Sequence, residues 1–121
     1  MTNPFRDQEK FMKACDQSTG KWDREQFDLY VNLIKEESDE LDVAYNANNR
    51  TEMLDALIDI IVVTVGAVHS MGADAEGAWK EVMKTNFEKI DNETGKVRKR
   101  EDGKVLKPTG WTPPALTQFV K

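Results

Sequence analysis

Two groups of acidic residues in the first half of the chain could together bind a metal ion. Within each group, members three and four residues apart fall on one face of a helix. Carboxylates gathered in an apolar setting must take up protons or bind a cation. Oxygen donors, in a chain with a single Cys and one distant His, favour Mg²⁺ or Mn²⁺ over zinc. The first group is Glu36, Glu37 and Glu40, and the second is Glu52, Asp55 and Asp59.

Each group also has a simpler explanation. A row of acidic residues is typical of the solvent-exposed face of a surface helix, and Glu36 and Asp39 fit that alternative. Glu37 does not, because it occupies the step of the apolar pattern between Ile34 and Leu41 where a core residue is expected.

The second group could instead be neutralised by salt bridges. Asp55 and Asp59 interrupt an otherwise apolar segment, and buried Asp is rare without a partner. Arg50 or Lys35 could supply the opposite charge. If the two acidic groups face each other, however, a metal site is the favoured interpretation.

Four helices are expected to position these groups. Asp23 is a plausible N-cap with Gln26 completing a capping box, Thr51 is the expected N-cap of the apolar helix, and Gly72 ends it. A short polar turn at 46–50 should pair the two acidic helices antiparallel. The expected helices cover about residues 4–17, 23–46, 51–72 and 74–90.

Length and composition predict one globular domain over residues 1–121. The chain is 39% hydrophobic with a net charge of −5, which argues against non-specific nucleic-acid binding. Its most apolar stretch, 54–68, falls short of the roughly 20 residues of a membrane span, so no membrane partner is expected. A single Cys and the lack of an apolar leader favour the cytoplasm.

The composition changes after Asp91. Six cations fall between Lys96 and Lys107, and an Asp-Gly pair at 102–103 separates two short segments with strand character. We therefore expect residues 92–121 to form a basic β-hairpin followed by an irregular tail.

These motifs resemble the all-α nucleotide pyrophosphohydrolases, the MazG-like superfamily, and in particular its small single-domain branch of phages and bacteria. One departure is Ala56, where the family's E-x-x-D motif would place an acidic residue three before Asp59; Asp55 stands four before it instead. The segments that carry the resemblance are 36–41, 55–63, 81–90, 95–107 and 113–114.

The resemblance implies an all-α antiparallel bundle of about four helices that hydrolyses nucleoside triphosphates between the α and β phosphorus atoms. Mg²⁺, replaceable by Mn²⁺, would be the cofactor, and the products would be a monophosphate and pyrophosphate. The implied metal ligands are Glu37, Glu40, Asp55 and Asp59, with Glu52 as a further possibility. The other implied site residues are Glu36 or Glu37 as the catalytic carboxylate, Lys89, Arg100, Lys104 and Lys107 for phosphate, and Gln17 and Asn86 for the nucleoside.

Other functions remain open at this point. The same scaffold could hydrolyse phosphoribosyl-ATP or dUTP, and a helical module that binds a cation without catalysis is the non-enzymatic alternative. Residues 54–68 are apolar around almost their whole circumference, so self-association to a homodimer or homotetramer is expected. The expected setting is the cytoplasm of a bacterium or of a phage-infected cell.

Overall fold

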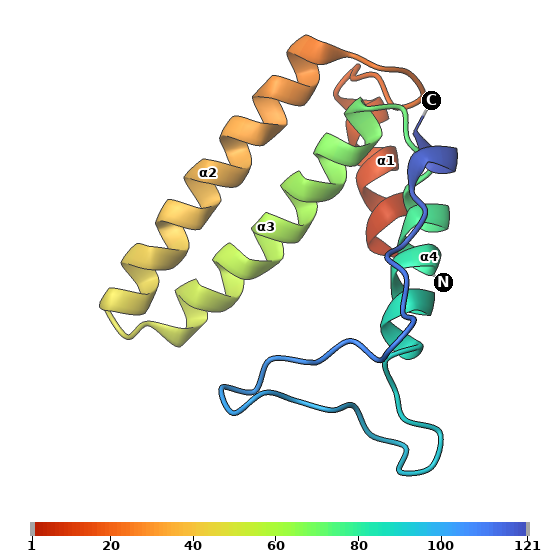
Figure 1. The fold of residues 1–121 in the computed structure, drawn as a ribbon. Helices are drawn as coiled ribbons and strands as arrows, with labels where there is room; N and C mark the ends of the chain where they lie inside the picture. The colour runs from red at the N-terminus through yellow and green to blue at the C-terminus, as the bar shows by residue number, and fades with distance from the viewer. Residues whose placement is uncertain (1, 121) are drawn as a thin grey trace. The chain divides into compact units, whose positions relative to one another are not determined.

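The computed structural model describes residues 2–120 and is built from α-helices, as predicted. The chain divides into two compact units, one running to Ala75 and including Val120, the other spanning Glu76–Phe119. The prediction of a single domain stays a prediction. In chain order (Figure 1), the elements are α1 (Pro4–Ala14), α2 (Arg24–Asn46), α3 (Arg50–Ser70), α4 (Ala75–Phe87) and the 3₁₀ turn η1 (Thr117–Phe119).

α2 begins where the sequence indicates. Asp23 is its N-cap, and Asp23 Oδ1 accepts a hydrogen bond from the Gln26 backbone N–H. The expected return bond of a capping box does not form, because the Asp23 backbone N–H donates to the Ser70 carbonyl and Gln26 Oε1 accepts from the Ser18 N–H. Gln26 Nε2 donates to the Ser18 carbonyl and to Ser70 Oγ. Gln26 therefore ties the loop before α2 to the end of α3.

α3 begins earlier than predicted. Asn49, not Thr51, is the N-cap, and its side chain accepts a hydrogen bond from the Glu52 backbone N–H at 3.1 Å. At the other end, Gly72 has a φ of +73° and donates to the His69 carbonyl. The left-handed glycine directly after the helix end is the expected terminator.

α2 and α3 form an antiparallel pair joined by a short turn, and α1 packs against α3 (Figure 1). The core of this unit is centred on Met12, Tyr30 and Ala67, which are at least 94% buried. His69 is also buried, and its Nε2 donates to the Phe5 carbonyl at 2.8 Å. These contacts hold one end of the α2–α3 pair rigidly against α1.

A second face of α3 carries exposed apolar side chains. Five large side chains at helical spacing are between 37% and 61% exposed: Leu54, Leu57, Ile58, Ile61 and Val62. We call this set the α3 apolar stripe. α3 is 21 residues long and contains an 18-residue window with a mean hydropathy of 1.7, so by length and composition alone it could cross a membrane. The expectation of no membrane partner stays a prediction. Core helices of soluble proteins pass the same test.

The predicted C-terminal β-hairpin was wrong, since residues 92–120 contain no strand. Two isolated antiparallel bridges form instead, between Ile90 and Val97 and between Lys99 and Val105. Gly103, with a φ of +90°, makes the expected turn. The Asp-Gly pair therefore marks the turn as predicted. The flanking segments do not form strands, because an isolated two-stranded hairpin is only marginally stable without a surface to pack against.

The packing of Tyr30 against α3 predicts that Gly66 tolerates no side chain. A Cβ at Gly66 would lie 2.3 Å from Cε1 of the Tyr30 ring. Gly66→Ala should therefore lower the free energy of unfolding by about 2–3 kcal/mol, although alanine favours helix elsewhere. Urea unfolding measures this, and Gly20→Ala is the control because no atom lies within 4 Å of its Cβ position. Equal stability of both variants would contradict the packing.

Candidate functional site

Four carboxylates from α2 and α3 lie close enough to influence one another. We call Glu37, Glu40, Asp55 and Asp59 the acidic cluster. The pKa of Glu37 is raised from 4.5 to about 7, chiefly by burial, then by a hydrogen bond with Glu40 and by the negative charges of Glu40, Asp59 and Asp55. The antiparallel pairing of the two helices thus brings the two predicted acidic groups together.

Glu37 is the centre of this cluster. Its side chain is half-buried, and Oε2 is buried with no hydrogen-bond partner. A buried carboxylate oxygen without a partner is costly unless it gains a proton or a cation. Glu37 therefore fits an ion, and the all-oxygen surroundings fit Mg²⁺ or Mn²⁺. The prediction that Glu37 replaces a core residue is consistent with this burial.

A cleft of about 550 Å³ opens between α2 and α3 beside the cluster. Glu40 and Asp55 line it, together with Glu52 and Asp39. The role of Glu52 as an additional ligand stays a prediction. Asp39 was treated in the sequence as part of a solvated face, and its position directly before Glu40 gave no sign of the cleft. Glu36 is exposed and does not line the cleft.

The carboxylates face one another without forming a closed coordination shell. Among residues 2–120, no three His, Cys, Asp or Glu side chains converge closely enough to hold an ion. Glu40 and Asp55 are exposed, whereas Glu37 and Asp59 are partly buried. The two packed helices therefore place the four carboxylates near one another without closing a shell around an ion.

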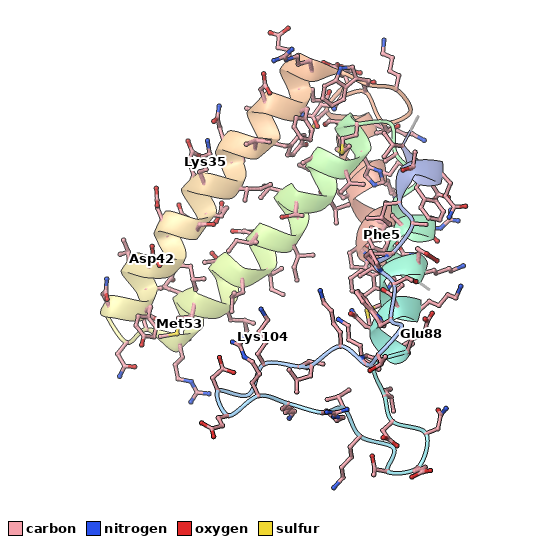
Figure 2. All side chains as sticks on the ribbon, in the orientation of Figure 1. Phe5, Lys35, Asp42, Met53, Glu88 and Lys104 are labelled. Carbon is pink, nitrogen blue, oxygen red and sulfur yellow. The ribbon has the colours of Figure 1, made fainter. Side chains whose placement is uncertain are left out.

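The salt-bridge alternative for the α3 carboxylates is not realised. Within the described residues, neither Asp55 nor Asp59 forms an ion pair. In Figure 2, Lys35 lies on the outer side of α2 and points away from α3. The negative charge of the cluster is therefore not neutralised by the cations that the sequence offered.

In the second unit, two predicted site residues contact each other at the end of α4. Lys89 Nζ donates to Asn86 Oδ1 at 3.1 Å, and Asn86 Nδ2 donates to Met83 Sδ at 3.7 Å. Lys89 Nζ also lies 4.8 Å from the centre of the Trp111 ring, and Lys107 Nζ lies 5.0 Å from it. No motif or spacing in the sequence predicts that Trp111 contacts these lysines.

The remaining predicted phosphate ligands differ from this pair. The Arg100 guanidinium donates to both carboxylate oxygens of Asp102. Asp102 raises the pKa of Arg100, and Arg100 in turn lowers the pKa of Asp102. Lys104 is exposed and shapes the turn through its backbone N–H, which donates to Asp102 Oδ1. Arg100 thus forms an ion pair with Asp102.

Gln17, predicted to bind the nucleoside, has a structural contact. Its Oε1 accepts a hydrogen bond from the Tyr30 hydroxyl, which also accepts one from Gln8 Nε2 at 3.5 Å. The Gln17 carbonyl oxygen therefore anchors the loop after α1 to the core. Its role in nucleoside binding stays a prediction.

A comparison with known protein families assigns the chain. Residues 6–86 match the family described as phosphoribosyl-ATP pyrophosphohydrolase, a range that covers more than half of the 121 residues and includes the whole acidic cluster. The chain belongs to this family. It is therefore an enzyme of the MazG-like all-α superfamily, a nucleotide pyrophosphohydrolase acting on phosphoric anhydrides. No curated protein shows significant similarity to it.

The matched range of this pyrophosphohydrolase ends at residue 86, near the end of α4. The basic segment that also resembled the superfamily in sequence lies beyond that range. The family assignment therefore rests on the helices that carry the acidic cluster.

The raised pKa of Glu37 predicts a pH-dependent stability in the absence of metal. Its pKa is about 7 in the folded chain and ordinarily 4.5, so the unfolded chain loses this proton first as the pH rises. Stability therefore falls between about pH 4.5 and 7, by at most about 3 kcal/mol. Urea unfolding in EDTA at pH 5 and pH 8 measures the loss, and MgCl₂ should restore stability at pH 8.

Glu37→Gln provides the comparison for this measurement. The variant keeps the size of the side chain and removes its charge, so it should lose less stability between pH 5 and pH 8 than the wild type. The interpretation would be wrong if both proteins showed the same pH dependence, or if MgCl₂ stabilised them equally.

Proposed function

We propose that this pyrophosphohydrolase uses Mg²⁺ to hydrolyse nucleoside or deoxynucleoside triphosphates between the α and β phosphorus atoms. The products are a nucleoside monophosphate and pyrophosphate. The observation that carries the proposal is the buried, unpartnered Oε2 of Glu37 among three further carboxylates. A site of this kind attracts divalent cations. Polyphosphate substrates also require such cations, which neutralise their negative charge.

The carboxylates have two roles in this proposal, which are ion binding and proton transfer. Glu37, Glu40, Asp55 and Asp59 would hold the ion, with Glu52 at the edge of the cleft as an additional ligand. When bound, Mg²⁺ would neutralise phosphate charge and make the phosphorus easier to attack. Glu36 or Glu37 would orient the attacking water or accept its proton; Glu36 is exposed and Glu37 is half-buried.

The reaction adds one water across the anhydride. The water oxygen forms a new P–O bond as the bond to the bridging oxygen breaks, and a carboxylate of the chain takes the water proton. Pyrophosphate leaves as an anion, so cationic side chains favour its departure. Among the cations offered for phosphate, Lys89 and Lys107 form no ion pair within residues 2–120, and both lie against the Trp111 ring.

Phosphoribosyl-ATP is the second candidate substrate. The matched family is described by that substrate, and its hydrolysis also splits a nucleotide between the α and β phosphorus atoms. A panel of the common ribo- and deoxyribonucleoside triphosphates plus phosphoribosyl-ATP, with Mg²⁺, separates the two. Release of monophosphate and pyrophosphate supports the proposed bond cleavage; release of orthophosphate alone contradicts it.

The acidic cluster predicts a strong effect of Asp59→Asn on turnover. Removing one carboxylate from a shared ion site should lower kcat/KM by at least about 100-fold while the helical fold is kept. Asp42→Asn is the matched control, since Asp42 is on α2 but lies on its outer side in Figure 2. Circular dichroism checks the fold, and full activity of Asp59→Asn would remove this residue from the ligand set.

We further propose that the enzyme self-associates through the α3 apolar stripe. Five exposed apolar residues on one helix face form a continuous surface that a second copy of the α2–α3 pair could cover. Covering both faces of α3 would turn the two-helix pair into a four-helix layer with a dry interior. The dimer is the smallest assembly that meets this need.

Light scattering after gel filtration in detergent-free buffer tests the assembly. The wild type should elute with at least twice the mass of one chain, and Ile58→Lys with Ile61→Lys should shift it toward the monomer. Phe11→Lys is the control, because Phe11 is 62% exposed but belongs to α1. A monomeric wild type, or an unchanged mass of the double variant, would contradict self-association.

A further inference from the structure

Trp111 connects the C-terminal segment to the end of α4 within the second unit. Its indole Nε1 donates a hydrogen bond to the Thr85 carbonyl at 2.7 Å, which fixes the plane of the ring. Two ammonium groups lie near that ring, Lys89 Nζ at 4.8 Å and Lys107 Nζ at 5.0 Å from its centre. Both distances are within the range of cation–π attraction.

One ring thus gathers two like charges. Since both nitrogens lie about 5 Å from the same point, they are no more than about 10 Å apart. Neither ammonium has a carboxylate within salt-bridge distance in the described part of the chain. Lys89 Nζ is further held by Asn86 Oδ1. Two positive charges held near each other without an acidic partner create a positive local potential, which attracts an anion.

The other cations of the segment lack these features. Arg100 Nε and Nη2 already donate to Asp102, and Lys104 lies over no aromatic ring among residues 2–120. Of the four cations that the sequence offered for phosphate binding, the geometry therefore selects Lys89 and Lys107.

We propose that Trp111 is a positioning residue, which holds Lys89 and Lys107 together as a binding site for a polyphosphate group. The proposal rests on the proposed function, because pyrophosphate is the polyphosphate group that the proposed reaction releases. Trp111 itself contacts the lysines through its ring face and the backbone through Nε1, so the two contributions can be separated by substitution.

Binding of inorganic pyrophosphate to the full-length protein in EDTA tests the proposal by calorimetry. Trp111→Leu should weaken binding roughly tenfold, as should Lys89→Met and Lys107→Met. Trp111→Phe keeps a ring face and loses only the Nε1 hydrogen bond, so it should bind within about threefold of the wild type. Lys99→Met is the control, as an exposed lysine of the same segment, and should leave binding unchanged.

Non-additivity distinguishes positioning from a merely structural role. If Trp111 acts by holding Lys89, then the double variant of Trp111→Leu with Lys89→Met should bind little worse than either single variant. In turnover assays, Trp111→Leu should raise KM more than it lowers kcat. A wild type that does not bind pyrophosphate, a Trp111→Leu that binds like wild type, or a Trp111→Phe as weak as Trp111→Leu would overturn the proposal.

A second measurement covers the case in which Trp111→Leu fails to fold. Replacing Trp22 and Trp79, both exposed, by Phe leaves Trp111 as the one tryptophan. Pyrophosphate should then change its fluorescence, and Lys89→Met with Lys107→Met should abolish the change; an unchanged signal in the parent overturns the site. Because this binding needs neither metal nor turnover, its failure is distinct from a failure of the proposed hydrolysis.

Discussion

Mutual repulsion among the carboxylates between α2 and α3 is the constraint on which the structure of the site depends. Burial and three neighbouring acids raise the pKa of Glu37 to about 7, and its Oε2 has no partner. Two packed helices with a short turn hold these groups at fixed backbone positions, so the repulsion is not relieved by the chain moving apart. A proton or a divalent cation must relieve it.

The same helix pair explains why the apolar composition of α3 coexists with acidic residues. The side of α3 that meets α2 carries Asp55 and Asp59, α1 also contacts α3, and the α3 apolar stripe is exposed. The proposed ion site and the proposed self-association therefore use the same helix.

Local patterns in the sequence predicted the helices well, but they could not predict contacts between residues far apart in the chain. Asp23 is predicted as a cap because an acid precedes a periodic segment. Asn49 caps α3 in place of Thr51, in keeping with the stronger preference for Asn at this position. Glu37 was found because it breaks an apolar pattern. The contact of Trp111 with Lys89 joins two loop positions, for which spacing gives no rule.

Proton release on Mg²⁺ binding tests the central claim most directly. Titration calorimetry at pH 6 in buffers of different ionisation enthalpy counts the protons displaced per ion. Because Glu37 is mostly protonated at that pH, binding should release close to one proton, and at pH 8.5 almost none. Mg²⁺ that does not bind, or that binds with no proton release at pH 6, would contradict the account.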